Sequence, residues 1–279
     1  MSADLNRGSP VAVATGAAID ARAAIEARGL SVGYGREVIV AGLDFVLNRG
    51  EKLALVGSNG SGKSTLLKTI AGLIRPLAGD LSVLGSRPLA EPARVAYLGQ
   101  FHPAGMSLPL RAIDIVRMAR FARHGLFGRL DGEDEKSVLE AIEAMGVGEL
   151  VDQPLNRLSG GQKQRVFIAQ ALARKADLLL FDEPASSLDA PSIETYRRLL
   201  DDVAAAGAAV VIATHDIDEA SACDKTMLLA QRVVAYGPSE AVLTPEYLLS
   251  TFGIVGRYRE GRIVAIDREH GCGDEEVRL

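Results

Sequence analysis

The sequence predicts an α/β fold: a core built on a parallel β-sheet, an antiparallel β part before it, and an inserted α-helical part in the middle of the chain. Apolar runs of strand length recur at 53–56, 177–181 and 208–213, as in strands that are covered on both faces of a parallel sheet. Shorter alternating runs between 24 and 47, broken by glycines, predict antiparallel strands. Helical periodicity within 101–158 predicts the inserted helical part.

Composition limits the class of protein. The chain has 279 residues, of which 48% are apolar, which suits one large domain with an insertion. Its formal net charge of −5 argues against a surface built throughout to bind nucleic acid. Cys223 and Cys272 lack metal-ligand spacing, so we expect neither a disulfide framework nor a zinc site, and a reducing cytosol fits. No apolar run approaches the roughly 20 residues of a membrane-spanning helix, so we expect a soluble chain.

Three segments are expected along the chain. Residues 1–23 are predicted to form a flexible N-terminal extension, because charged residues flank the apolar stretch 11–19 more closely than a signal peptide allows. Residues 24–256 are expected to form the folded domain, with the helical part at about 101–158. Residues 257–279 are a polar, weakly patterned tail, which we interpret as an ordinary terminus in preference to a metal sensor.

Helical spacing is clearest in three stretches. Residues 112–123 and 134–145 fall in the inserted part, and the second is expected to have one apolar face made of Val138, Leu139, Ile142 and Met145. Residues 192–206 predict a crossover helix, capped by Ser192 and ended by Gly207. Five arginines make the inserted part locally basic, and we interpret them as a solvated helical face in preference to a surface for anionic lipid headgroups or an acidic partner: Arg111, Arg117, Arg120, Arg123 and Arg129.

The segment after the apolar run 53–56 has the pattern of a phosphate-binding loop, G-x-x-x-x-G-K-[ST]. Its residues are Gly57, Ser58, Asn59, Gly60, Ser61, Gly62, Lys63, Ser64 and Thr65. Backbone N–H groups of such a loop wrap the phosphates of ATP, Lys63 reaches the β and γ oxygens, and Ser64 can ligate Mg²⁺. Since a strand is predicted before the loop and a helix after it, ATP binding is favoured over a chance Gly/Ser-rich loop.

An acidic pair, Asp182 and Glu183, follows the run 177–181 at its carboxyl end, and His215 follows the run 208–213. Ligands of open α/β sheets bind beyond these strand ends, so the three segments are expected to converge on one site. Asp182 is predicted to hold the metal, and Glu183 to polarise the attacking water. Without the phosphate loop, an ordinary solvated turn would be the preferred explanation of this pair.

A second Ser/Gly-rich helix start is formed by Ser159, Gly160, Gly161 and Gln162, and the helix is expected to run through Arg174. A serine and two glycines at a helix N-terminus offer a hydroxyl and backbone donors to phosphate oxygens. One ATP cannot need both cradles within one chain. In the absence of a phosphate loop, a capped helix start would be the favoured interpretation.

With these two motifs in this order, the chain from about 27 to 253 resembles the ATP-binding cassette (ABC) family. The resemblance implies a P-loop NTPase (RecA-like) core and a head-to-tail dimer, in which the Ser159 cradle of one chain closes over ATP held by Lys63 of the other. It also implies roles for four further residues. Tyr34 stacks on adenine, Gln100 joins the metal, Asp189 lies in the loop that crosses the dimer, and His215 senses the γ-phosphate.

The resemblance also implies a function. Single-cassette ABC ATPases resemble motor subunits that lie on the cytoplasmic, inner face of the cell membrane and work with separate transmembrane permease subunits. It implies a second cassette, identical or related, and an extracytoplasmic solute-binding protein as further partners. The segments 125–142 and 242–253 are similar to importers of manganese, zinc or chelated iron.

Alternatives remain at this point. Import of a siderophore or vitamin is the nearest. A soluble ABC ATPase acting on ribosomes or DNA is less favoured, because the chain has neither tandem cassettes nor a long coiled coil, and no nucleic acid partner is expected. A scaffold that binds ATP without hydrolysing it is disfavoured by Glu183.

Overall fold

The computed structural model describes residues 22–100, 110–121, 123–124 and 128–252, together with the backbone of 255–259 and 262–266. Most of the expected N-terminal extension and of the polar tail, including Cys272, therefore lies outside the described residues, as do 101–109 at the start of the helical part. Gly253 at the end of the resemblance lies outside them too.

The parallel core is a six-stranded sheet in the order β5-β6-β7-β3-β8-β9. Its strands are β3 (Lys52–Val56), β5 (Val95–Leu98), β6 (Leu178–Asp182), β7 (Ala209–Thr214), β8 (Lys225–Leu229) and β9 (Val233–Pro238). All neighbours pair in parallel except β8 and β9, which are antiparallel. The three apolar runs of the sequence are thus β3, β6 and β7, as predicted, and the predicted fold class is confirmed.

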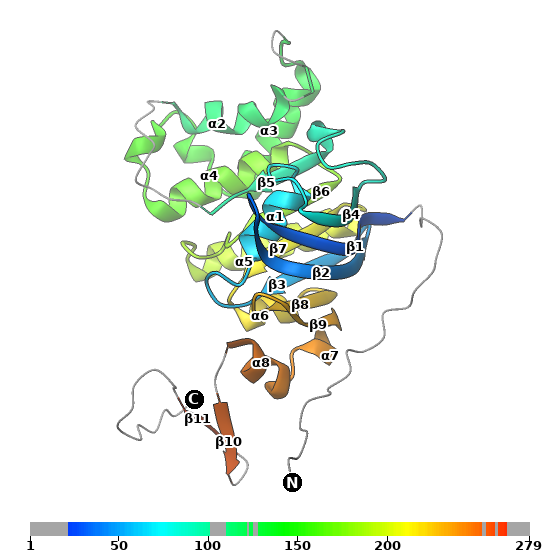
Figure 1. Ribbon diagram of the computed structural model, residues 1–279. Coiled ribbons are helices and arrows are strands. Elements are labelled where there is room, and N and C mark those ends of the chain that lie inside the picture. Colours follow the sequence, from blue (N-terminus) through cyan, green and yellow to red (C-terminus); the bar gives the residue numbers. More distant parts are fainter. Residues whose placement is uncertain are drawn as a thin grey trace, which may run out of the picture.

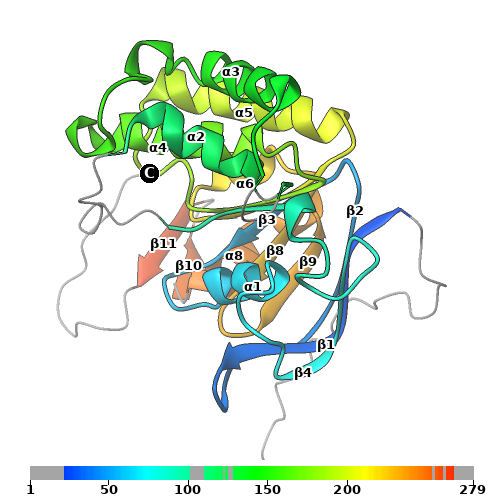
Figure 2. The same ribbon diagram turned by 90° about the horizontal axis from the view of Figure 1, so that it is seen from above.

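The sheet is covered on both faces, which explains why its strands are apolar without alternation. Leu53 and Leu55 of β3 pack in one cluster with α1 (Lys63–Ile70), whereas Ala54 and Val56 pack in another with α5 (Ala190–Ala205). Figure 2 shows α1 and α5 on opposite sides of the sheet. Every residue of β3, β6 and β7 except Lys52 is buried.

A separate antiparallel sheet has the order β2-β1-β4, formed by β1 (Ala23–Tyr34), β2 (Glu37–Asn48) and β4 (Ala78–Val83). Its inward side chains, among them Leu30 and Leu43, share the cluster that holds Leu66 and Ile70 of α1. Figure 1 shows β1 and β2, in dark blue, beside α1. The first helix of the core therefore lies between the two sheets.

The helical part contains α2 (Ala112–Phe121) and α3 (Gly132–Ala144), and it also includes α4 (Gly160–Ala173), which begins after the expected end at about 158 but packs on both. The three helices gather at one end of the molecule (Figure 1). Val138 and Ile142 of α3 are buried as expected. Leu139 is not: its side chain is 57% exposed. It follows Val138 directly, and a step of about 100° around a helix carries it off the buried face, where Ala141 takes the expected place.

The interpretation of all five arginines as a solvated face is wrong for Arg120, which is 1% exposed. Its Nε donates to Asp134 Oδ1 at 2.8 Å, and one of its terminal nitrogens donates to the carbonyls of Ala173 and Arg174 at 3.0 and 3.1 Å. A buried charge requires such partners. Arg120 thus joins α2 to α3 and to the last turn of α4.

The crossover helix begins earlier than predicted. Asp189, and not Ser192, is its N-cap, because the Asp189 carboxylate accepts a hydrogen bond from the backbone N–H of Ser192 at 3.1 Å. Pro191 at the start of the helix agrees with this position, since proline is favoured in the first turn. The predicted stop is confirmed at Gly207, which has a φ of +98° after the last turn.

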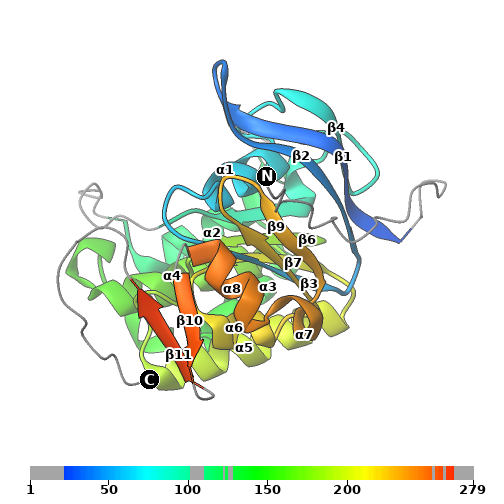
Figure 3. The ribbon, with the colours of Figure 1, turned by 60° about the horizontal axis from the view of Figure 1, so that its bottom comes forward.

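Beyond the core, α6 (Ile217–Ser221), α7 (Ser239–Val242) and α8 (Pro245–Phe252) follow, and α7 and α8 contact the β8–β9 hairpin (Figure 3). Near the end of the chain, β10 (Val255–Arg259) pairs with β11 (Arg262–Ile266) in an antiparallel hairpin. None of the helices in the described ranges has the length and apolarity to cross a membrane.

Candidate functional site

Four neighbouring strands end at the candidate site. The carboxyl ends of β5, β6, β7 and β3 are followed by Gln100, by Asp182 and Glu183, by His215, and by the phosphate loop 57–65, respectively. Because these strands are adjacent and parallel, segments far apart in sequence reach the same edge of the sheet. The predicted convergence therefore follows from the observed strand order.

The glycines of the phosphate loop stand where a side chain would clash. A Cβ on Gly57 would lie 2.2 Å from the carbonyl oxygen of Leu229, and one on Gly62 would lie 2.4 Å from Val40 Cγ2. Gly62 has a φ of +108° and is the N-cap of α1, with no side-chain hydrogen bond to cap the helix. The N–H groups of the first turn of α1 therefore remain available to an anion.

Lys63 is buried within this loop, with 5% of its surface exposed. Its Nζ donates to the carbonyl oxygens of Gly57 at 2.5 Å and Ser58 at 3.0 Å. Burial lowers the pKa of Lys63 in spite of the nearby carboxylates of Glu183 and Asp182. Ser61 Oγ is also buried and has no hydrogen-bond partner among the described residues. A buried cation and an unpaired hydroxyl are what a phosphate group would satisfy.

A magnesium ion fits beside the loop. The Ser64 hydroxyl donates to Asp182 Oδ1 at 3.0 Å, which brings together two oxygen ligands of the kind Mg²⁺ prefers. Burial raises the pKa of Asp182, and the hydrogen bond from Ser64 opposes that shift. A carboxylate that is costly to keep charged in this position is stabilised when a divalent cation binds to it.

Glu183 lies at the centre of the converging segments. Gln100 Nε2 donates to Glu183 Oε2 at 3.3 Å, and His215 Nδ1 lies 3.8 Å from Glu183 Oε1. The backbone of Glu183 has a φ of +52°, which is unfavourable for residues other than glycine. Its N–H donates to Ala213 O at 2.9 Å. Strain of this kind accumulates at functional sites, where the surrounding structure holds it. The structure therefore brings together Gln100, Glu183 and His215.

Tyr34 lies at the end of β1, half exposed, and its position is compatible with contact to a ligand. Tyr97 was not predicted. Burial, together with the nearby Asp182 and Tyr34, raises the pKa of Tyr97 to about 12, and its side chain packs against the cluster that α1 shares with the antiparallel sheet. The signal in the sequence is slight: a tyrosine in the apolar strand that leads to Gln100.

A second group that was not predicted, Glu219, interacts with the residue that precedes His215. Glu219 is buried in α6, and its pKa is raised by burial, against a hydrogen bond from the Thr214 hydroxyl. Thr214 Oγ1 also accepts from the N–H of Asp216 at 3.0 Å. The residues on both sides of His215 are thus fixed to α6. A glutamate four residues after a histidine has no distinctive pattern, which is why the sequence alone did not identify it.

The Ser159 segment lies elsewhere. The helix α4 begins where the sequence predicts, and Ser159 is its N-cap: its Oγ accepts from Gln162 N at 3.2 Å, and Gln162 Oε1 accepts from Ser159 N at 2.8 Å. A Cβ on Gly161 would lie 2.8 Å from the carbonyl oxygen of Ser187, so the segment packs on the loop between β6 and α5, whose end is Asp189. Among the described residues, no hydrogen bond joins this segment to the phosphate loop.

Comparisons with known proteins agree with this geometry. A family model described as ABC transporter matches residues 40–186. The manganese transport system ATP-binding protein MntB of Bacillus subtilis is 33% identical over 230 residues, which cover 82% of this chain and 92% of the relative. The zinc transport system ATP-binding protein TroB of Treponema pallidum is 34% identical over 231 residues, which cover 82% and 87%.

Solved structures give the same picture. An inward-facing metal-chelate type ABC transporter superposes with a TM-score of 0.74 at 29% identity, covering 88% of this chain and 98% of that chain. A dimeric ATP-binding cassette bound to ADP and Pi superposes with a TM-score of 0.66 at 26% identity, covering 77% and 98%. The similarity therefore spans the sheet core, the antiparallel sheet and the helical part.

Proposed function

The chain belongs to the ABC transporter family and is an ATP-binding subunit that hydrolyses ATP, and on that premise we propose that it powers the import of a metal ion or metal chelate through separate membrane subunits. The observation that carries the proposal is the similarity, at about one third identity over more than four fifths of the chain, to ATP-binding subunits named for manganese and zinc transport. A chelated iron transport protein of Yersinia pestis, YfeB, is 36% identical over 218 residues.

In this proposal the phosphate loop holds the phosphates of ATP, with Lys63 directed to the β and γ oxygens. Ser64, Asp182 and Gln100 hold Mg²⁺, which when bound neutralises charge on the phosphates. The 3.0 Å contact between Ser64 and Asp182 supports this assignment. Tyr34 stacks on the adenine.

Glu183 polarises the water that attacks the γ-phosphate, and His215 contacts the transferred group. The side chain of Glu183 is suited to this role, because Gln100 orients one of its oxygens and the other stays open toward His215. Gln100 follows β5 and precedes the helical part, so a change at the γ-phosphate reaches that part through the Gln100–Glu183 contact.

We propose further that the active unit contains two cassettes arranged head to tail. The support is geometric. Among the described residues, no hydrogen bond joins this segment to the phosphate loop of the same chain, and its residues are exposed or half-exposed: Ser159, Gly160, Gly161 and Gln162. A partner cassette would present this segment, and Asp189 beside it, to the nucleotide held by Lys63. The second cassette is either a copy of this chain or a relative.

Permease subunits in the membrane and an extracytoplasmic solute-binding protein complete the proposed assembly, with this chain on the cytoplasmic face. The first test is co-purification. A tagged chain, extracted with mild detergent from its native membrane, should bring a polytopic membrane protein with it and hydrolyse Mg-ATP. Recovery of the chain without a membrane protein would contradict the proposal.

The second test identifies the substrate. Cells that lack the chain should accumulate less manganese, zinc or iron, measured by elemental analysis, and the wild-type gene should restore the metal content. Glu183→Gln, which keeps the shape of the side chain, should fail to restore it and should trap an ATP-bound dimer. Normal metal content with loss of labelled siderophore or vitamin uptake would favour the alternative substrates.

A further inference from the structure

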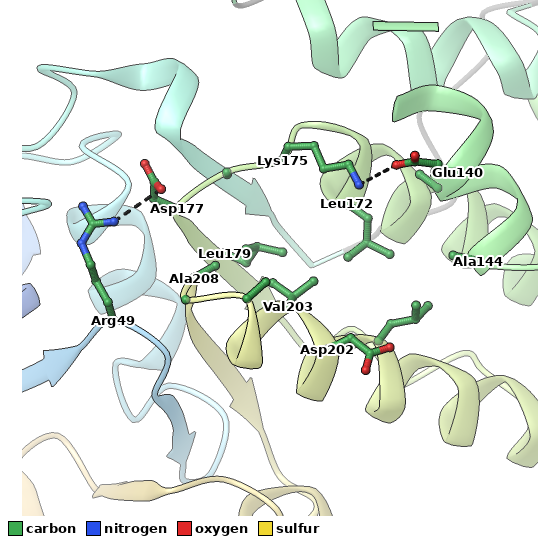
Figure 4. Close-up of a pocket in the computed structure, with 15 residues that line it drawn as sticks. Arg49, Glu140, Ala144, Leu172, Lys175, Asp177, Leu179, Asp202, Val203 and Ala208 are labelled. Carbon is green, nitrogen blue, oxygen red and sulfur yellow. Dashed lines mark hydrogen bonds and ion pairs between the residues drawn. The ribbon is translucent and has the colours of Figure 1, made fainter. Parts of the chain in front are cut away.

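A groove of about 730 Å³ lies at the opposite edge of the sheet from the nucleotide site. Its residues come from α3, the end of α4, α5, and the segments that lead into β6 and β7. Figure 4 shows Arg49 at one side of the groove and Glu140 and Ala144 of α3 at the other. No residue that we assign to ATP binding or hydrolysis lines it.

The groove has an apolar floor, and two pairs of opposite charges lie on its rim. Leu172, Leu179, Leu199 and Val203 contribute to the floor. On the rim, Lys175 Nζ bonds to Glu140 Oε2 at 2.8 Å, and an Arg49 nitrogen lies 3.4 Å from Asp177 Oδ1 (Figure 4). The charges within each of these pairs neutralise one another, and Asp202, the remaining charged residue of the lining, is exposed to solvent. The groove therefore suits an uncharged, apolar occupant better than an ionic ligand.

The chain itself delivers such a segment to this place. Arg22 is the first described residue, and its carbonyl oxygen accepts a hydrogen bond from the N–H of Arg49 at 2.9 Å. Residues 1–21 precede it, and among them the stretch 11–19 is apolar and carries no charge. An extended chain spans about 3.5 Å per residue, so Ile19 can lie no more than about 10 Å from Arg22, within reach of the end of the groove that Arg49 lines.

We propose that residues 11–19 of the same chain dock in this groove. The larger side chains of the stretch, Val11, Val13 and Ile19, have odd numbers, and alanine or glycine occupies every even position. An extended segment would direct these larger side chains to one face, toward the apolar floor. Asp20 ends the apolar stretch where the chain approaches the Arg49 rim.

The docked segment links two parts of the molecule. One wall of the groove is formed by Ala141 and Ala144 of α3, and the other by Leu199 and Val203 of α5, which packs on the parallel sheet. A segment that contacts both walls resists movement of the helical part relative to the core. The proposal concerns the position of the segment in one chain and does not depend on the transported substrate.

Disulfide cross-linking tests the position directly. In a full-length chain with Cys223→Ser and Cys272→Ser, Ala144→Cys is combined in turn with Ala12→Cys, Ala14→Cys and Ala18→Cys, so that the register need not be known. In the control, Leu73→Cys takes the place of Ala144→Cys. Leu73 is 60% exposed and follows α1, on the opposite side of the sheet. At least one groove pair should cross-link within the chain about tenfold faster than its control, as expected when docking raises the effective concentration.

Equal rates with Ala144→Cys and Leu73→Cys would overturn the proposal. A cross-link that joins two chains instead of closing a loop within one would also overturn it, because the occupant would then be a second copy.

Hydrogen exchange provides an independent measurement on the full chain. Val13→Asp and Ile19→Asp should expel the segment, and amides at 140–144 and 199–205 should then exchange about threefold faster or more, since they lose a covering layer. Ser9→Asp adds the same charge outside the stretch and should leave the exchange rates unchanged. No change in the first two variants, or the same change in all three, would show that the segment does not cover the groove.

Discussion

The phosphate loop and the Ser159 segment both place serine and glycine at a helix N-terminus, but they leave the first turn of the helix in opposite states. At α1 the N-cap is Gly62, which offers no side-chain acceptor, and Lys63 is buried against loop carbonyls. At α4, Ser159 and Gln162 satisfy each other's backbone N–H groups in a complete capping box. One helix start leaves its first N–H groups available to an anion, and the other is already capped.

This difference separates two physical uses of the same residue types. The phosphate loop gains stability when a phosphate satisfies its free N–H groups and the buried ammonium, so it is a binding site within a single chain. The Ser159 segment needs no ligand to be stable. It contributes to nucleotide binding only when its exposed serine and glycines meet a nucleotide held elsewhere, which is why we assign it to the partner's ATP.

The largest expected effect comes from breaking each cradle separately and then mixing the variants. Lys63→Ala removes the buried cation, so the ATPase rate should fall on the order of 10²–10³-fold, as for loss of a charge-stabilising donor. Ser159→Ala should leave nucleotide binding by the single chain intact while it reduces turnover. In an equal mixture with free exchange, half of the dimers are mixed and each has one intact site, so about a quarter of the wild-type rate should return.

Steady-state ATPase assays of each variant and of the mixture check this prediction. A mixture that is no more active than the mean of its two components would contradict head-to-tail sharing of the cradles. Nucleotide titration of each isolated variant is the control, since only Lys63→Ala should lose affinity.

The second effect concerns what holds α4 in place. Arg120→Leu leaves Asp134 buried without its guanidinium and leaves the carbonyls of Ala173 and Arg174 without a donor, so it should cost about 3 kcal/mol of unfolding free energy. Arg117→Leu is the matched control on the same helix, because the pair of Arg117 with Glu135 is partly exposed and should contribute under about 1 kcal/mol. Denaturant unfolding measures both.

If the two arginine variants lose the same stability, α4 is not anchored through Arg120. ATP affinity adds a second criterion: because the phosphate loop lies on β3 and α1, Arg120→Leu should leave nucleotide binding by the folded chain unchanged.

A smaller effect on stability is expected to distinguish the glycine at the start of α1, Gly62, from the glycine at the start of α4, Gly160. Gly62→Ala combines a φ of +108° with a Cβ at 2.4 Å from Val40 Cγ2, so we expect a loss of about 2 kcal/mol and weaker ATP binding. Gly160→Ala should change stability by less than about 0.5 kcal/mol, because a Cβ there meets no atom within 4 Å. Similar shifts of the denaturation midpoint in the two variants would show that the helix starts are not different in the way described.

The sequence predicted the local structure of the two helix starts better than it predicted their surroundings. The loop 57–65 and the strands beside it are specified locally, by glycines at fixed spacing and by apolar runs, and so were found. Arg120 was misassigned because its burial depends on Asp134 and on the end of α4, which are remote in sequence. The N-cap of the crossover helix was wrongly assigned to Ser192 for a local reason, because serine and aspartate are both good N-caps. Only the position of Pro191, which belongs in the first turn, identifies Asp189 as the N-cap.

The smallest effect is a difference in how the two regions respond to acid. Burial raises the pKa of Asp182, so in the absence of metal its carboxylate takes up a proton at a higher pH than an ordinary aspartate, and Mg²⁺ affinity should decline first as the pH falls. Asp134 behaves in the opposite way. Burial raises its pKa, but hydrogen bonds from Asp131 N–H, Arg120 and His124 together outweigh burial and hold the pKa at about 2.

The stability that Asp134 contributes is therefore complete above the pKa of an unfolded aspartate, 3.8, and is lost only as the pH falls toward 2. Mg²⁺ titrations in the presence of a nucleotide analogue, and helix content by circular dichroism, should show metal affinity declining at a higher pH than helix loss. Asp134→Asn should remove the acid step in stability, with the Mg²⁺ titration unchanged. Coincident midpoints for metal affinity and helix content in the wild type would mean that the acid response belongs to the whole fold, and that the nucleotide edge and the α4 anchor are not electrostatically independent.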